Sequence, residues 1–244
     1  MANGFRTFGF GKDDDNVGKG GKVAKFKAKQ GETYRISFIN WPGLAEGTPN
    51  FDAETPMFEG DHMNFIKGVG RVLNRGPEYT RIAGEPPKLR IMGIIAVWLT
   101  TKKGQIDAQA IQDGDVEVFM WDLPETKYAD LKPIHQEWHF GSHDLRATCT
   151  KADWQEMTFG PCKDSLIRKV FENDKLKAAR DSILAAAQEL LPKMRPEIGR
   201  EMTIDQIREK LAGAGGGGGG GASNQLADPG TTEDIDGLVD DLLG

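Results

Sequence analysis

A run of seven consecutive glycines at residues 215–221 limits which part of this chain can fold. Glycine loses more backbone entropy on folding than any other residue and brings no side chain to a core, so the run is expected to act as a flexible linker. The 244 residues are enough for one good core with a helical appendage, and that core must precede the glycines. We expect a linker at 213–233 and a separate disordered tip at 234–244.

Charge divides the chain in a similar way. The formal net charge is −6, and residues 213–244 hold six acids and no base, so the preceding residues are neutral overall. Among those, residues 17–103 carry 14 bases against 8 acids, whereas residues 104–212 carry 15 against 20. A polyanion meets local charge rather than the average, so the basic half is a candidate surface for nucleic acid.

A strand-rich domain is expected at residues 23–163, after a flexible N-terminal arm at 1–22. Apolar residues alternate with period two in TYRISFIN (33–40) and in KLRIMGIIAVWL (88–99), and VEVFMW (116–121) is a further strand. A short or kinked helix is expected in the segment from Pro124 to Trp138. DLRATCT and EMTF then form a closing hairpin.

Strands, a short helix and two more strands follow the order of an OB-fold. We therefore predict a β-rich α+β protein: an OB-fold-like five-stranded barrel with a C-terminal helical segment and a disordered acidic tail. Residues 42–87 would form a long insertion between the first two strands, either functional or partly disordered.

Residues 164–212 are expected to be helical because apolar residues recur there at helical spacing, and to pack against the barrel or against a second subunit in a homo-oligomer. Asp164 is the expected N-cap, and Asn173-Asp174 is a point where the helix breaks in two. Thr203 and Gln206 form a capping box at the start of a last helix, which should end at Gly213.

Bases and aromatic residues are interspersed in the basic half. Lysine and arginine bind phosphates with release of counterions, and aromatic rings stack on unpaired bases. The alternatives are a solvated face for the lysine run and core positions for the aromatics. The predicted nucleic-acid surface consists of Lys25, Lys27, Lys29, Arg35, Arg71, Arg75, Tyr79, Arg81, Arg90 and Trp98.

Metal and catalytic motifs are weak. Two histidines and two cysteines (His139, His143, Cys149 and Cys162) lie within 24 residues but lack the close pairing of structural zinc sites, so no metal or other cofactor is predicted. Phosphate-binding loops, GxSxG elbows and HExxH motifs are missing from the sequence, and we predict a protein that is not an enzyme.

The tip, DIDGLVDDLLG, alternates acids with aliphatic residues. An acidic tail that only increases solubility is one interpretation, but solubility does not require the leucine and valine residues of the tip. On a flexible tether, the tip could compete with DNA for the chain's own basic surface and dock on partner proteins. The residues proposed to bind partners are Asp234, Asp236, Leu238, Val239, Asp240, Asp241, Leu242 and Leu243.

The combination of an expected OB barrel, the linker GAGGGGGGGASNQ and the tip DIDGLVDDLLG resembles phage-type single-stranded-DNA-binding proteins. The resemblance implies sequence-independent binding of single strands during replication, recombination or repair, and recruitment of polymerase, helicase or primase through the tip. The tip ends in Leu-Leu-Gly, where bacterial relatives end in an aromatic residue. Two other classes stay open: an interaction or virion protein with an acidic tail, and an RNA-binding or strand-annealing accessory protein.

Bulk features favour a cytoplasmic location, in the host cell if the protein is viral. The sequence has no run of about 20 apolar residues and no apolar signal segment at its start. Its two cysteines fit a reducing compartment better than a disulfide framework.

Overall fold

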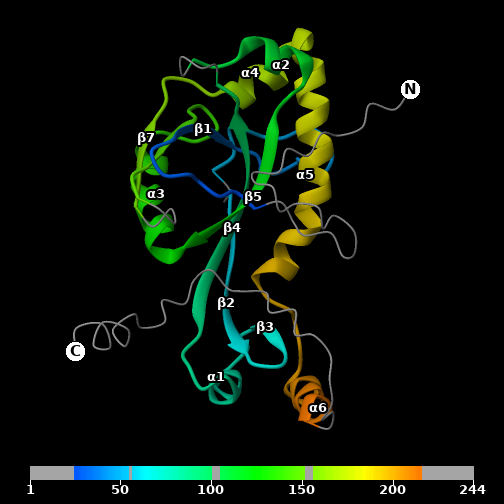
Figure 1. Ribbon diagram of the computed structural model, residues 1–244. Helices are drawn as coiled ribbons and strands as arrows, with labels where there is room; N and C mark the ends of the chain where they lie inside the picture. The colour runs from blue at the N-terminus through cyan, green and yellow to red at the C-terminus, as the bar shows by residue number, and fades with distance from the viewer. Residues whose placement is uncertain (1–24, 55–56, 101–104, 152–155, 216–244) are drawn as a thin grey trace, which may run out of the picture.

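The computed structural model describes residues 25–54, 57–100, 105–151 and 156–215 (Figure 1). The strands are β1 (Thr33–Phe38), β2 (Glu59–Ile66), β3 (Gly70–Leu73), β4 (Lys88–Trp98), β5 (Glu117–Pro124), β6 (Leu145–Cys149) and β7 (Met157–Pro161). The helices are α1 (Pro77–Ala83), α2 (Ala108–Asp113), α3 (Glu125–Glu137), α4 (Leu166–Glu172), the 3₁₀ turn η2 (Asp174–Leu176), α5 (Lys177–Ile198) and α6 (Ile204–Gly215).

Strand β4 organises a seven-stranded antiparallel sheet. One edge of β4 pairs with β5 along nearly its whole length. Its other edge is shared, because residues 88–92 pair with β2 and residues 95–98 pair with β1. Beyond β1 the sheet continues through β6 to β7, and beyond β2 it ends at β3. The long strand β4 therefore connects two groups of strands.

The larger group, which we call the body, comprises β1, β4–β7 and α2–α5. Helix α5 lies on one side of β4 and β5, and α3 lies on the other (Figure 1). Both faces of β4 are consequently buried, which explains why its apolar residues fill nearly every position instead of alternating strictly with polar ones. The core of the body is rich in aromatic rings, including Phe38 stacked on Trp121.

The smaller group, which we call the distal lobe, comprises β2, β3, α1 and α6. It projects from the end of the body at which β4 begins (Figure 1). It has a small core of its own, made of Ile66, Val69, Val72, Tyr79 and Ile207. The backbone joins its parts, since Leu73 N donates to Arg200 O, and Arg200 N donates to Arg71 O. The distal lobe is thus built from an insertion between β1 and β4 and from the last described helix.

The predicted α+β class is confirmed, but the described helices hold more residues than the strands, so the fold is not β-rich, and the sheet has seven strands instead of five. The additional strands come from the segment 42–87, which was expected to be a loop and instead forms β2, β3 and α1. Glycines lie where this segment turns. Positive φ angles, which favour glycine, are found at Gly68 and Gly70 in the hairpin turn and at Gly84 at the end of α1. Helix α2, capped by Asp107, was not predicted.

The helical segment follows the prediction closely. Ser165, instead of Asp164, caps α4 by accepting a hydrogen bond from Arg168 N. The expected break at Asn173 separates α4 from η2. Thr203 and Gln206 exchange the two hydrogen bonds of a capping box, and α6 continues to Gly215 instead of ending at Gly213. Among the described residues, no helix is long and apolar enough to cross a membrane.

Candidate nucleic-acid interface

Lys25, Lys27 and Lys29 are the described part of the lysine run, and Lys25 is the first residue of the chain that the structure describes. Phe26 is buried and its N–H donates to Met120 O of β5, so Lys25 and Lys27 flank an anchored position. Lys25 Nζ forms an ion pair of 2.7 Å with Glu197 of α5. Lys27 and Lys29 are exposed. Because Lys25 already has a carboxylate partner, it is less available to bind a phosphate.

Arg35 lies in a polar network instead of on an open surface. Its guanidinium donates to Asp144 at 2.7 Å and to Asp164 at 2.6 Å. The Asp144 carboxylate is fully buried and also accepts hydrogen bonds from Ser37 Oγ and from Leu166 N at the start of α4. Arg35 therefore holds α4 and β6 to β1, and its predicted role in phosphate binding is replaced by a structural one.

Arg90 and Trp98 share one face of β4, but both are buried. Arg90 is 6% exposed and pairs with Asp122 on the neighbouring strand β5. Trp98 is 2% exposed, and its Nε1 donates to Ser37 Oγ at 2.7 Å. A base cannot stack on a ring that the core already covers, so the assignment of Trp98 and Arg90 to the surface was wrong.

Tyr79 is also a core residue. It is 9% exposed within the small core of the distal lobe, and its hydroxyl donates to Met202 O at 2.8 Å. This contact ties α1 to the segment that leads into α6. Trp41 in the body is buried in the same way, with its Nε1 donating to Phe38 O.

An exposed aromatic ring is found instead on the hairpin of the distal lobe. Phe65 on β2 is 49% exposed and lies directly opposite Arg71 of β3. Side chains of directly opposed residues leave an antiparallel pair on the same face, so the ring and the guanidinium are neighbours. Lys88 of β4 is paired with Met63 of β2 and therefore lies on this face too. Lys67 is exposed in the turn between β2 and β3. We call Phe65, Lys67, Arg71 and Lys88 the hairpin patch.

Electrostatic surroundings favour an anion at the hairpin patch. The sequence from residue 62 to residue 77 contains three bases, Lys67, Arg71 and Arg75, and no acid. No carboxylate of the described residues lies within ion-pair distance of Lys67, and Lys88 has a long contact of 3.5 Å with Glu85. Arg81 is exposed on α1. Phe65 thus shares one face with Arg71 and Lys88, next to the exposed Lys67 of the turn.

Phe65 is not among the residues predicted from the sequence to bind nucleic acid. Phe65 is exposed because its neighbours on β2, Asn64 and Ile66, are both buried. In a strand with one covered face, the residue between two inward-facing positions points outward. The signal that the sequence offered for this region was the stretch from residue 62 to residue 77, which has three bases and no acid.

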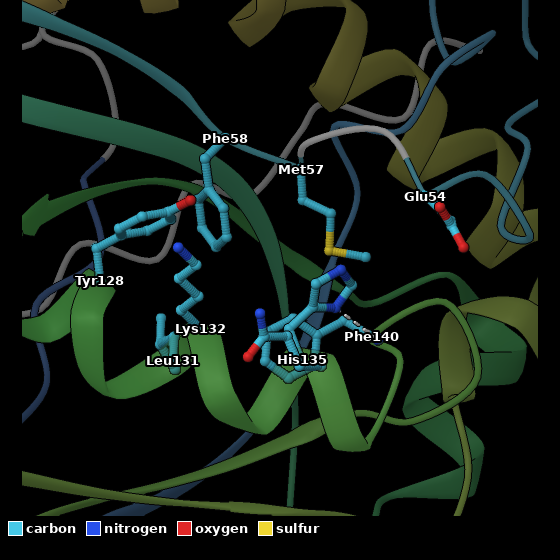
Figure 2. Close-up of a pocket in the computed structure, with 9 residues that line it drawn as sticks. Glu54, Met57, Phe58, Tyr128, Leu131, Lys132, His135 and Phe140 are labelled. Carbon is cyan, nitrogen blue, oxygen red and sulfur yellow. Dashed lines mark hydrogen bonds between the residues drawn. The ribbon is translucent and has the colours of Figure 1, made fainter.

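A separate cavity of about 220 Å³ lies between α3 and the segment before β2. Tyr128, Lys132 and His135 extend from α3 toward Met57 and Phe58, and Glu54 lies apart from them (Figure 2). The ring nitrogen Nδ1 of His135 accepts a hydrogen bond from Phe140 N at 3.2 Å. Burial, and to a smaller extent the neighbouring His139, lower the pKa of His135. The cavity could hold a small apolar group, but its polar side chains form no nucleophile–base pair within the described residues.

The four possible zinc ligands are spread over different surroundings. Nδ1 of His139 accepts a hydrogen bond from Gly141 N, and Sγ of the buried Cys149 lies 3.1 Å from Lys151 O. Cys162 is half-buried after β7. Within the described residues, no three His, Cys, Asp or Glu side chains are grouped so that they could hold a metal ion.

The first residues of the expected linker, 213–215, belong to α6, whereas its remainder and the acidic tip, including the predicted partner-binding residues at 234–244, lie outside the described residues. Comparison with known proteins identifies no family model, no curated protein and no solved structure that matches this chain.

Proposed function

We propose that the protein binds single-stranded DNA with little sequence preference, and that the hairpin patch is the main contact. Phe65 supplies a ring on which an unpaired base can stack, at about 1 to 3 kcal/mol per base. Lys67, Arg71 and Lys88 supply positive charge for the phosphates on either side. The observation that carries this proposal is the half-exposed Phe65 opposite Arg71, on a projecting hairpin whose residues 62–77 include three bases and no acid.

We further propose that the body is an OB-type barrel. In its favour, β1, β4, β5, β6 and β7 are five strands with α3 placed before the fourth, and they pair in the order β5-β4-β1-β6-β7. OB-folds bind oligonucleotides on their second and third strands and on the loops between the first two and the last two strands. Here α5 covers β4 and β5, whereas the segment between β1 and β4 contains the exposed hairpin. This arrangement favours the distal lobe over the sheet face as the contact with DNA.

In this proposal the acidic tip has the role implied by the resemblance to phage-type single-stranded-DNA-binding proteins. It competes with DNA for the hairpin patch and, when DNA displaces it, recruits replication proteins. The protein would act in the cytoplasm of a host cell, without catalysis of its own. An interaction or virion protein would show no salt-dependent binding to oligonucleotides, and an RNA-binding protein would prefer RNA.

Titration of the full-length protein with a labelled oligo-dT, the same sequence in RNA and a duplex of equal length tests the proposal. At about 50 and 200 mM salt, we expect preference for the single strand and a marked loss of affinity at the higher salt. Phe65→Ala should weaken binding about 5- to 150-fold, which corresponds to one stacked base. Trp138→Ala is the matched control, because Trp138 is a similarly exposed aromatic residue, at 39%, on the body.

Equal affinity for single strand and duplex, or equal losses in the two variants, would contradict a stacking site at Phe65. Preference for the RNA oligonucleotide would move the protein to the RNA-binding class.

A further inference from the structure

Two arginines from different parts of the molecule converge on one carboxylate oxygen at the base of the distal lobe. Oδ2 of Asp61, on β2, accepts hydrogen bonds from Nη1 of Arg75 at 3.0 Å and from Nη2 of Arg195 at 2.9 Å. Arg75 follows β3, and Arg195 lies in the last turn of α5. The contact therefore bridges the lobe and the body.

The Asp61 carboxylate is held in its ionised form. Burial raises its pKa, but the hydrogen bonds from Arg75 and from His62 N, together with the charges of both arginines, outweigh this and keep the pKa below its usual range. Arg75 Nε also contacts Glu201 at 3.3 Å, although that carboxylate is 74% exposed and weakly held. Arg195 is 49% exposed and pairs with Asp61 alone among the described residues.

This cluster lies on the same face of the hairpin as Phe65. Asp61, Met63 and Phe65 alternate along β2, so their side chains leave the same side of the sheet. Four residues of strand separate Asp61 from Phe65 by about 13 Å, a distance that a short extended single strand covers. A strand that stacks a base on Phe65 and continues toward the body reaches Arg75 and Arg195.

Guanidinium groups bind carboxylates and phosphates through the same planar array of N–H donors. Two guanidinium groups converge on a single anionic oxygen, and Arg195 is exposed and uses only its Nη2 in a hydrogen bond to a described residue, so donors are left for a phosphate. We propose that Arg75 and Arg195 form a phosphate-binding position at the base of the distal lobe, and that Asp61 holds both arginines there and opposes the incoming phosphate. The inference rests on the proposed binding of single-stranded DNA and adds Arg195 and a path for the strand.

Asp61→Asn in the full-length protein tests this position. Asparagine keeps an oxygen that can accept from the arginines but removes the charge that repels a phosphate. Relief of one such charge at about 4 Å in water corresponds to roughly fivefold tighter binding of oligo-dT at low salt. Glu78→Gln is the control, because it removes the same charge from the lobe at a site where Glu78 pairs with Arg208 instead.

Arg195→Ala provides the second measurement. It should weaken binding and reduce the slope of log affinity against log salt by about 1, and its cost should be larger in the Asp61→Asn background, where the arginine is no longer neutralised. Circular dichroism and amide exchange establish that each variant keeps the distal lobe folded.

The outcomes separate the two proposals. If the wild type binds and Phe65→Ala weakens binding, but Asp61→Asn and Glu78→Gln tighten it equally, only the phosphate position is overturned. The same holds if Arg195→Ala leaves the salt slope unchanged, or if a folded Asp61→Asn protein binds no tighter. If the wild type does not bind oligo-dT at low salt, the proposed function fails and the phosphate position fails with it.

Discussion

The body and the distal lobe use the same residue types for opposite purposes. In the body, aromatic rings are packed against one another and arginines are neutralised, as Trp98 donates to Ser37 and Arg35 is held by Asp144. In the distal lobe, Phe65 is half-exposed, and Lys67 has no carboxylate partner among the described residues. Composition alone does not distinguish a core from a binding surface. Whether a ring or a charge can contact a ligand depends on which helices and strands pack over it.

The two regions also differ in the size of their cores. The body surrounds β4 with helices on both sides, whereas five buried side chains form the centre of the lobe. A small core supports less local stability, so the lobe is expected to open without the body. The following variants are chosen to break or sharpen this contrast.

The largest effect is expected from Asp144→Ala in the body. It leaves Arg35, Ser37 and Leu166 N without their shared acceptor, and breaking a buried ion pair from one side costs about 3 to 5 kcal/mol of unfolding free energy. Chemical denaturation measures the loss. Asp164→Ala is the control, because Asp164 contacts the same arginine from a more exposed position and should cost less than about 1 kcal/mol. Equal losses would mean that the network contributes no more than a surface pair.

Ile207→Ala should act on the distal lobe alone. Ile207 is fully buried between α6 and the hairpin, and its truncation should lower the local opening free energy by roughly 2 to 3 kcal/mol. Amide exchange should accelerate in β2, β3 and α6 but not in β5 or β6. Ile183→Ala, at a fully buried position of α5, should instead reduce protection throughout the body. Faster exchange everywhere in the Ile207 variant would show that the lobe and the body unfold as one unit.

Truncation after residue 221 tests whether the acidic tip competes with DNA at the hairpin patch of the distal lobe or shields the body instead. It removes six acids and no base, so the net charge changes from −6 to 0. If the tip competes for the hairpin patch, truncation should tighten oligo-dT binding by about tenfold at low salt and by less at high salt. In a Phe65→Ala, Lys67→Ala background the gain should shrink. A gain that persists there would indicate that the tip shields the body instead of the lobe.

The contrast also explains which features could be predicted from the sequence. Alternation located β1 and β4, and the Thr203–Gln206 capping box located the start of α6, because these patterns depend on neighbours within a few residues. The fate of Trp98 could not be predicted in this way. Trp98 lies on the same face of its strand as the polar residue Arg90, which suggested an exposed face. In the structure, α5, about 90 residues further along the chain, covers the sheet, and Asp122 pairs with Arg90.

The structure of residues 42–87 also depends on distant parts of the chain and could not be predicted from neighbouring residues. Their glycines and prolines indicated a loop, and the hairpin and α1 form because Ile66, Val72 and Tyr79 pack against Ile207, more than 120 positions away. The site was misplaced for this reason: the exposed ring belongs to a segment whose folding depends on a distant helix.

A smaller effect is expected from single lysines. Lys67→Ala should reduce the slope of log affinity against log salt by about 1, since it removes one phosphate contact from the hairpin patch. Lys25→Ala should leave the slope unchanged, because Lys25 is already paired with Glu197. Titrations at three or more salt concentrations give both slopes. A reduced slope for Lys25 and an unchanged one for Lys67 would place the DNA on the body.

The smallest effect concerns pH and should be confined to the body. Burial and the nearby His139 lower the pKa of His135 in the folded protein below its ordinary value of 6.5. As the pH falls below about 6.5, the unfolded chain therefore takes up a proton at this position before the folded protein does, and the unfolding free energy decreases until the folded pKa is reached. Above that window His135 contributes no pH dependence. Denaturation at a series of pH values should show a weaker decrease in His135→Gln than in the wild type, whereas local opening of the distal lobe, followed by amide exchange, should not respond to the substitution. An identical pH dependence in variant and wild type would mean that His135 is as accessible to protons in the folded body as in the unfolded chain.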